Sequence, residues 1–186
     1  MRDVVLLQFL SLDGVAEEPS DWMFDDGPEL FALVGDVIAT QDDVLLGRGT
    51  YDYWAGHWPT SDLEPFAPFI NATTKHVATS SPLMPDWSNS VVMDRPVLDY
   101  VQDLRRGPGR DIGVHGSTLL ARSLLDAGLV DRLRIVMPSN VAGHGRRLFD
   151  TDGDAGLQRF TLSSVEATPG GTLLLDYRRA GVSDAA

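Results

Sequence analysis

The chain reads Asp43-Val-Leu-Leu-Gly-Arg-Gly-Thr-Tyr51 and, further on, Asp111-Ile-Gly-Val-His-Gly-Ser-Thr-Leu119, two stretches that share one pattern. Each runs from a short apolar segment, typical of a buried strand, through glycine and a hydroxyl residue into a segment with helical spacing. Glycine allows the backbone to approach a ligand closely, and the unpaired amides of a helix's first turn attract anions. Two such junctions predict a site for a phosphate-rich cofactor.

The rest of the chain predicts strands and helices in alternation around these junctions. Apolar runs predict strands over residues 3–10, 43–46, 75–79, 90–93 and 111–115, and helical spacing predicts helices over 29–41, 50–55, 97–106 and 117–127. Beyond residue 128, strands are predicted over 132–137, 160–167 and 172–177, with no comparable helix between them. This order predicts an α/β fold whose central sheet is mixed and mostly parallel, with antiparallel C-terminal strands.

Length and composition limit the class of protein. With 186 residues, an apolar fraction of 43% and a charged fraction of 23%, the chain is expected to form one globular domain over residues 1–179, followed by a tail over 180–186. No apolar run approaches the roughly 18 residues that a membrane span needs. Asp3 stands where a signal peptide carries positive charge. We therefore expect a cytoplasmic protein that is not bound to a membrane.

The net charge and the cysteine content limit the kinds of ligand, disulfide and metal site that are expected. The formal net charge is −12, which disfavours nucleic acid as a partner because such binding depends on basic surfaces. An anionic ligand must therefore be held by a local site. The sequence has no cysteine, and its four histidines are far apart, so neither a disulfide nor a resident metal site is expected.

The junction around Gly47 departs from the ordinary dinucleotide-binding pattern, because Asp52 stands where that pattern has glycine or alanine. Arg48 at the predicted helix start can still fork onto a phosphate, and Thr50 adds a hydroxyl. The second junction offers the same kinds of donor. The ordinary alternatives are a glycine turn with a solvated arginine at the first junction and a serine or threonine N-cap at the second.

Three further segments carry candidate residues. Residues 79–81 supply hydroxyls that fit a ribose phosphate or an ordinary turn. Gly143 lies in a glycine- and arginine-rich segment, 141–149, that fits an anion site or a mobile surface loop. Asp13 follows the first strand, and its carboxylate fits substrate orientation, proton relay or a backbone turn. An aromatic pocket, or else packing in the core or against a partner subunit, is expected for Trp22, Phe24, Trp54 and Trp58.

The ordered set of motifs resembles the dihydrofolate-reductase-like superfamily. The motifs are Ser11-Leu-Asp-Gly14, Leu46-Gly-Arg-Gly-Thr-Tyr51, Val114-His-Gly-Ser117 and Gly128-Leu-Val-Asp131. The chain is still more similar, from about residue 2 to residue 178, to the reductase domain of the bifunctional riboflavin-biosynthesis deaminase-reductase, here standing alone. The resemblance implies a three-layer α/β/α fold, bound NADPH and a homodimer. It also implies hydride transfer to a small pyrimidinone- or pterin-like heterocycle or to a related, carbonyl-like substrate.

The resemblance also implies roles for individual residues. It implies that Gly47, Arg48, Gly49 and Thr50 hold cofactor phosphate, and that Thr79, Ser80 and Ser81 lie at the 2′-phosphate. It also implies that Gly116, Ser117, Thr118 and Leu119 lie at the pyrophosphate, that Val15 and Ala16 lie near the nicotinamide, and that His115 and Gly143 belong to the cofactor site. Asp13 is the first candidate for substrate orientation or proton relay, and Glu29 the second.

One position at which the chain departs from its relatives bears on which substrate is expected. Leu30 and Phe31 stand nearest to the position at which the folate enzyme has an acidic residue facing the pteridine, with Glu29 only adjacent. This departure disfavours folate reduction. The alternatives to a reductase of small heterocycles are therefore an NADP-binding module without turnover, acting as a sensor or scaffold dimer, and a true dihydrofolate reductase.

Overall fold

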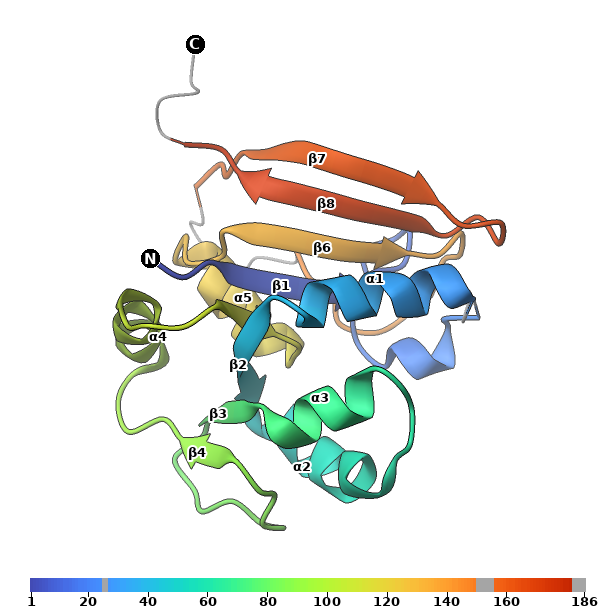
Figure 1. The fold of residues 1–186 in the computed structure, drawn as a ribbon. Coiled ribbons are helices and arrows are strands. Elements are labelled where there is room, and N and C mark those ends of the chain that lie inside the picture. The colour runs from blue at the N-terminus through green and yellow to red at the C-terminus, as the bar shows by residue number, and fades with distance from the viewer. Residues whose placement is uncertain (25–26, 150–155, 182–186) are drawn as a thin grey trace.

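The computed structural model describes residues 1–24, 27–149 and 156–181, and within them eight strands form a single sheet in the order β4-β3-β2-β5-β1-β6-β8-β7 (Figure 1). The strands are β1 (Val4–Phe9), β2 (Gln41–Gly47), β3 (Thr74–Ala78), β4 (Ser90–Val92), β5 (Asp111–Val114), β6 (Arg132–Met137), β7 (Phe160–Ala167) and β8 (Leu173–Arg179). Pairings from β4 to β6 are parallel, and β8 runs antiparallel to both β6 and β7. The predicted mixed, mostly parallel sheet with antiparallel C-terminal strands is confirmed.

Helices cover both faces of the sheet. They are α1 (Pro28–Ile38), α2 (Arg48–His57), α3 (Phe66–Ala72), α4 (Val97–Arg106) and α5 (Thr118–Asp126), with short 3-10 turns η1 (Pro19–Asp21) and η2 (Trp58–Thr60). Alternation along β1 sends Val5 to the face covered by α1, where it packs with Leu30, and Leu6 to the opposite face, where it packs with Leu124 of α5. This arrangement gives the three layers.

Helices α2 and α3 share the α1 face. Val44 lies beside Gly113 in the sheet register, and Gly113 lies beside Val5, so all three residues face the same layer. Val44 packs there with Tyr51 of α2 and Ile70 of α3. The space between α1 and α3 therefore lies over the middle of the sheet. Among the described helices, none has both the length and the apolar character that a membrane crossing requires.

The chain's only lysine ties α3 to the sheet. Lys75 on β3 is fully buried, and its Nζ donates to Ile70 O and Thr73 O, at 2.8 Å each. Nζ also lies 4.4 Å from the ring centroid of Trp87. The ammonium thus caps carbonyls at the C-terminal end of α3, where the helix dipole favours positive charge. Burial nevertheless lowers the pKa of Lys75 to about 8.

We expect the stability of the wild-type protein relative to Lys75→Met to increase between about pH 8 and pH 10.5. Below pH 8 the folded protein contains a buried ammonium, whose desolvation opposes folding, whereas the unfolded chain keeps its proton up to its ordinary pKa of 10.5. The unfolded state therefore binds more protons in this window, and the free energy of unfolding rises with pH. Urea unfolding of both proteins at about pH 7 and pH 10 measures the difference. A difference that stays constant or shrinks contradicts the expectation.

Candidate functional site

The predicted site segments meet at one edge of the sheet. Strands β1, β2, β3, β5 and β6 are parallel, so their carboxyl ends lie at the same edge, which is where open α/β sheets bind ligands. The described segments that follow these strands are residues 10–24, the start of α2 directly after Gly47, and residues 79–81, 115–117 and 138–149. Every candidate segment except Glu29 lies in these segments or in the helix turn that follows, so the structure gathers them along one edge.

The two glycine junctions touch. Gly47 N donates to Gly116 O at 3.0 Å. A Cβ built on Gly47 would overlap Ser117 Oγ and lie 3.0 Å from Ser117 Cβ, and a Cβ on Gly116 would lie 2.9 Å from Thr50 Oγ1. Gly116 also has a positive φ of 128°, which favours glycine. Two segments far apart in the chain therefore form a single surface built on closely packed backbone.

The start of α2 provides free donors at this surface. Its N-cap residue, Gly47, makes no side-chain capping hydrogen bond, and a Cβ on Gly49 would have no neighbour within 4 Å. The first-turn amides of α2 are thus left for a ligand. At α5 the N-cap interpretation is confirmed, because Ser117 Oγ accepts from Leu120 N, although at 3.5 Å the bond is long. Thr118 and the exposed Leu119 begin that helix.

Arg48 connects α2 to the loop after β3. Its Nε donates to the Asp52 carboxylate at 2.7 Å, and its Nη1 donates to Pro82 O at 3.0 Å and Thr79 Oγ1 at 3.4 Å. The arginine is therefore neither buried nor simply solvated. It places a guanidinium beside the Thr79 hydroxyl, next to the exposed Ser80 and Ser81.

Asp13 fastens the 141–149 segment to the loop after β1. Its carboxylate accepts hydrogen bonds from Ser11 Oγ at 2.7 Å, Ala142 N at 3.0 Å and Gly143 N at 3.1 Å. The Ser11 hydroxyl, together with the two backbone amides, lowers the pKa of Asp13 below its usual 3.8. Asp13 is thus a carboxylate at neutral pH with both oxygens occupied. These contacts differ from the turn interpretation, because the backbone amides that the carboxylate accepts lie in a distant segment and not in its own turn.

The same two segments pair along their length. Val15 forms a β-bridge with Arg147, and Ala16 N donates to Arg146 O at 2.9 Å. Val15 and Ala16 are buried, and a Cβ on Gly145 would lie 2.8 Å from Val15 Cγ1. The loop after β1 and the glycine-rich segment therefore form one wall of the candidate site.

Asp13→Ala is expected to release this wall. Loss of three hydrogen bonds to the carboxylate should raise the rate of tryptic cleavage after Arg146 and Arg147 by roughly tenfold, because proteolysis follows local opening. Limited trypsin digestion followed by mass spectrometry measures the rate. Asp62→Ala, a change at an exposed aspartate between α2 and α3, is the matched control and should leave that rate unchanged. Equal rates for the two variants would show that Asp13 does not hold the segment.

His115 lies between the junction and the α3 layer. Its Nε2 is 2.7 Å from Gln41 Oε1, and its ring packs against Phe66 and Phe69, with centroids 5.5 Å and 6.1 Å away. Burial lowers the pKa of His115 to about 4, so the ring is neutral at physiological pH. Gln41 was not predicted from the sequence, since a glutamine at a strand start has no distinguishing signal. The Gln41 side chain lies over Gly113 of the neighbouring strand β5, because this glycine has no side chain in its way. A Cβ on Gly113 would lie 2.6 Å from Gln41 Cδ.

The remaining candidates are dispersed. Glu29 is exposed in the first turn of α1. The four aromatic residues do not share one pocket: Trp54 and Trp58 pack against Phe66, Trp22 lies in the loop after β1, and Phe24 is 83% exposed. Within the described part of the chain, no group of three or more metal-ligating side chains occurs.

Solved proteins share this fold. A putative riboflavin biosynthesis protein from Shewanella sp. PV-4 superposes with a TM-score of 0.73 at 16% identity, covering 96% of this chain and 99% of that protein. Dihydrofolate reductase from Enterococcus faecalis, complexed with NADP(H), gives a TM-score of 0.64 at 16% identity, covering 96% and 97%. Identities this low show the fold alone, and they confirm the predicted dihydrofolate-reductase-like architecture.

A longer protein contains the same fold as one part. The diaminohydroxyphosphoribosylaminopyrimidine deaminase/5-amino-6-(5-phosphoribosylamino)uracil reductase from Thermotoga maritima matches 96% of this chain with a TM-score of 0.69 at 18% identity, and the chain spans 57% of that protein. The family model for the RibD C-terminal domain matches residues 2–174. With nearly its whole length covered by that model, the chain belongs to the RibD C-terminal domain family.

Proposed function

We propose that this protein is an NADPH-dependent reductase that transfers a hydride to a small heterocyclic acceptor of the pyrimidinone or pterin type. Membership of the RibD C-terminal domain family and the dihydrofolate-reductase-like fold support a reductase-type function. The observation that carries the proposal is the contact of the two glycine junctions through Gly47 N and Gly116 O. One phosphate-rich ligand along this edge can reach both helix starts at once.

The residues of the edge fit the phosphates of NADPH. The uncapped amides of α2 beside Gly49 suit one phosphate, and the start of α5 at Ser117 suits its neighbour in the pyrophosphate. Arg48, with the Thr79 hydroxyl beside it, suits the 2′-phosphate, because a guanidinium binds phosphate by paired hydrogen bonds. Since the chain carries a net charge of −12, such local donors have to overcome a repulsive surrounding field.

The wall of the site positions the acceptor in this proposal. NADPH, when bound, supplies the hydride. The buried Val15 and Ala16 line the nicotinamide end and exclude water, and Asp13 holds that wall closed through its bonds to the 142–143 amides. His115 stays neutral and holds Gln41 in place. We assign Asp13 a positioning role in place of proton relay, since its carboxylate holds the 142–143 amides and these bonds, with that from Ser11, lower its pKa.

Binding of NADPH, the first step of the proposed reaction, is tested by titrating the protein with NADPH while following nicotinamide and tryptophan fluorescence. We expect saturable binding in the micromolar range, with NADPH preferred to NADH. Oxidation of NADPH is then followed with pyrimidinones, dihydropteridines, dihydrofolate, flavins and quinones as acceptors. Absence of saturable NADPH binding below about 1 mM, which corresponds to roughly 4 kcal/mol, would refute the proposal.

A binding module without turnover is the second candidate, and the state of the carboxylates favours it. Asp13 is fully engaged by the protein, and Glu29 is exposed on α1. Asp13 is therefore held by the protein as an ionised carboxylate, a form that has no proton to donate. NADPH binding together with no oxidation by any acceptor class would select this candidate, and sustained oxidation with any one of them would remove it.

A cytoplasmic homodimer forms part of the same proposal. Most of β7 is exposed along the edge of the sheet, with Leu162 and Val165 46% and 51% exposed. Exposed apolar edge strands favour pairing with another chain. Light scattering at several protein concentrations tests the dimer, and a monomer mass throughout would remove it from the proposal.

A further inference from the structure

His115 stands at the edge of the sheet that carries the glycine junctions, directly after β5 and next to Gly116 of the second junction. Its ring lies on the same face of the sheet as Gly113, because a Cβ on that glycine would lie 2.7 Å from His115 Nε2. The ring also packs against Phe66 and Phe69 of α3. His115 therefore connects the proposed cofactor site to aromatic residues of α3.

Gln41 decides which nitrogen of the His115 ring carries the hydrogen. The Oε1 atom of Gln41 lies 2.7 Å from His115 Nε2, and a carbonyl oxygen can only accept a hydrogen bond. Burial lowers the pKa of His115 to about 4, so the ring has a single N–H at neutral pH. That hydrogen lies on Nε2, because the hydrogen bond of one ring nitrogen sets the state of the other. Nδ1 is left with a lone pair, as an acceptor.

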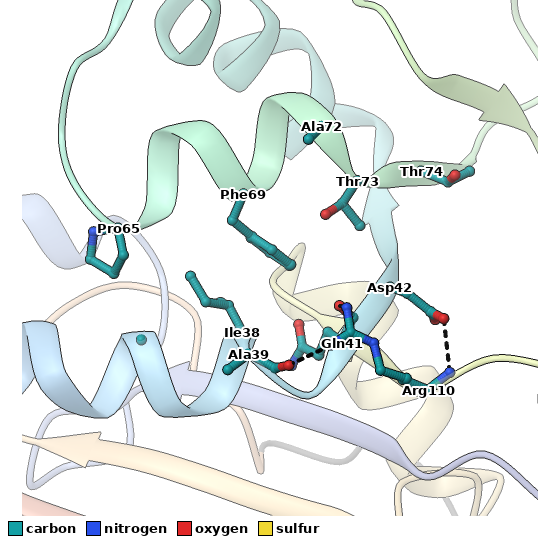
Figure 2. A pocket seen from close by; sticks show the side chains of 11 residues that line it. Ile38, Ala39, Gln41, Asp42, Pro65, Phe69, Ala72, Thr73, Thr74 and Arg110 are labelled. Carbon is teal, nitrogen blue, oxygen red and sulfur yellow. Dashed lines mark hydrogen bonds between the residues drawn. The ribbon is translucent and has the colours of Figure 1, made fainter.

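Gln41 is itself held in place. Figure 2 shows it where it lines a pocket between α1 and α3, with Arg110 beside it. Arg110 donates through Nη2 to Gln41 O at 3.0 Å and through Nη1 to Ala39 O at 2.7 Å, which fixes the start of β2. The Gln41 residue is 1% exposed. His115 does not line that pocket, so the role of Gln41 is to hold the histidine ring from below.

His115 Nδ1 is open to a ligand. It has no hydrogen-bond partner among the described residues, and it is not one of the buried unpaired polar atoms, so it retains accessible surface. The neighbouring groups of the cofactor site, the uncapped amides of α2 and the Arg48 guanidinium, are all donors. An acceptor at this place favours a ligand with an N–H group, and the aromatic neighbours of the ring favour a flat one.

We propose that His115 is a specificity-determining residue that accepts, at Nδ1, a hydrogen bond from a ring N–H of the heterocyclic acceptor, and that Gln41 is the positioning residue that keeps Nδ1 free of hydrogen. The inference rests on the proposed function and deepens it, since it names the group that recognises the acceptor. A heterocycle whose ring nitrogens are all alkylated cannot donate to Nδ1. Such a compound should bind about tenfold more weakly, the loss expected for one hydrogen bond.

The role of Gln41 is tested on the full chain without any ligand. Long-range nitrogen–proton NMR spectra at about pH 7 distinguish the two neutral forms of a histidine ring. We expect the hydrogen of His115 on Nε2, and a mixture of both forms in Gln41→Leu, while the exposed His57 gives the same signals in both proteins. Hydrogen on Nδ1 in the wild-type protein overturns the inference, because Gln41 would then present its amide group to the ring. A pure Nε2–H form in Gln41→Leu overturns the positioning role.

The role of His115 is tested with uracil and its alkylated analogue 1,3-dimethyluracil as probes, with and without saturating NADP+. We expect uracil to shift the His115 Nδ1 signal saturably and 1,3-dimethyluracil to bind at least about tenfold more weakly. Ligand-observed NMR should show a loss of about tenfold for uracil in His115→Leu and no loss in His57→Leu, the matched control. Equal binding of the two pyrimidines overturns the inference.

The remaining outcomes separate this inference from the proposed function. A shift of Nδ1 by NADP+ alone, with none from uracil, would assign the hydrogen bond to the nicotinamide carboxamide and overturn recognition of the acceptor. Saturable NADPH binding with no shift of Nδ1 by either compound overturns the role of His115 and leaves the reductase proposal standing. Failure of NADPH to bind refutes the reductase proposal, and the hydrogen position on the His115 ring still decides the role of Gln41.

Discussion

Gly47→Ala is expected to lower the free energy of unfolding by about 2–3 kcal/mol, the upper part of the range found when an extra methyl group is forced into a closely packed site. The backbone φ of Gly47 is −76°, which alanine adopts freely, so the effect is steric. The added Cβ would overlap Ser117 Oγ, which can rotate, and lie 3.0 Å from Ser117 Cβ and 3.1 Å from Ser117 N, which cannot. Urea unfolding measures the loss. A change below about 1 kcal/mol would show that the two junctions are not rigidly joined.

Gly49→Ala is the matched control, two residues away in the same helix start. Its Cβ would have no neighbour within 4 Å, and alanine has the better helix propensity, so the free energy of unfolding should stay the same or rise by up to about 1 kcal/mol. The methyl group nevertheless stands where the phosphate is proposed to approach the amides of α2. We therefore expect NADPH affinity to fall at least about tenfold in a fully stable protein. Unchanged NADPH affinity would contradict the assignment of the α2 start as the phosphate site.

Arg48→Ala is expected to weaken NADPH by about 1.5–3 kcal/mol and NADH by much less, if the guanidinium binds the 2′-phosphate. The structure supports this expectation because Arg48 Nη1 already lies beside the Thr79 hydroxyl. Fluorescence titration with both nucleotides gives the two losses. Equal losses would place Arg48 on the pyrophosphate, and no loss for either would leave it as a tether between α2 and the loop after β3.

Two further variants sharpen the Arg48 test. Asp52→Asn removes the carboxylate that competes for Nε and should strengthen NADPH binding, because the arginine is then free to serve the phosphate. Arg95→Ala removes an arginine that pairs with Asp94 and Asp103. Arg95 lies outside the candidate segments, so its loss should change neither nucleotide affinity. A similar loss for Arg95→Ala would mean that overall charge, and not the position of Arg48, governs binding.

Several periodic segments were predictable from the sequence, although the helix predicted over 29–41 ends at Ile38 and Gln41 already belongs to β2. Helix α4 and strands β6 and β7 have the bounds that their periodicity predicts, 97–106, 132–137 and 160–167. Helix α3 was missed because its seven residues, FAPFINA, are too few to show a helical period and include a proline. Tertiary packing of Ile70 and the cap from Lys75 hold it as a helix. A helix cannot be predicted from its local sequence pattern where the contacts that stabilise it come from other parts of the chain.

The candidate site, like the fold, was predictable from the sequence only in part. The sequence by itself determined the parallel sheet, the two glycine junctions and the acidic surface, since each depends on residue type and on spacing over a few positions. Only the tertiary structure decided that Gly47 packs against Ser117, that Asp13 is occupied by the 142–143 amides, and that Gln41 reaches His115 across bare Gly113. These contacts join residues that lie about 70 to 130 positions apart in the sequence, for example Gln41 and His115, or Asp13 and Gly143. No short-range period encodes such pairs, because their geometry exists only once strands from distant segments lie side by side.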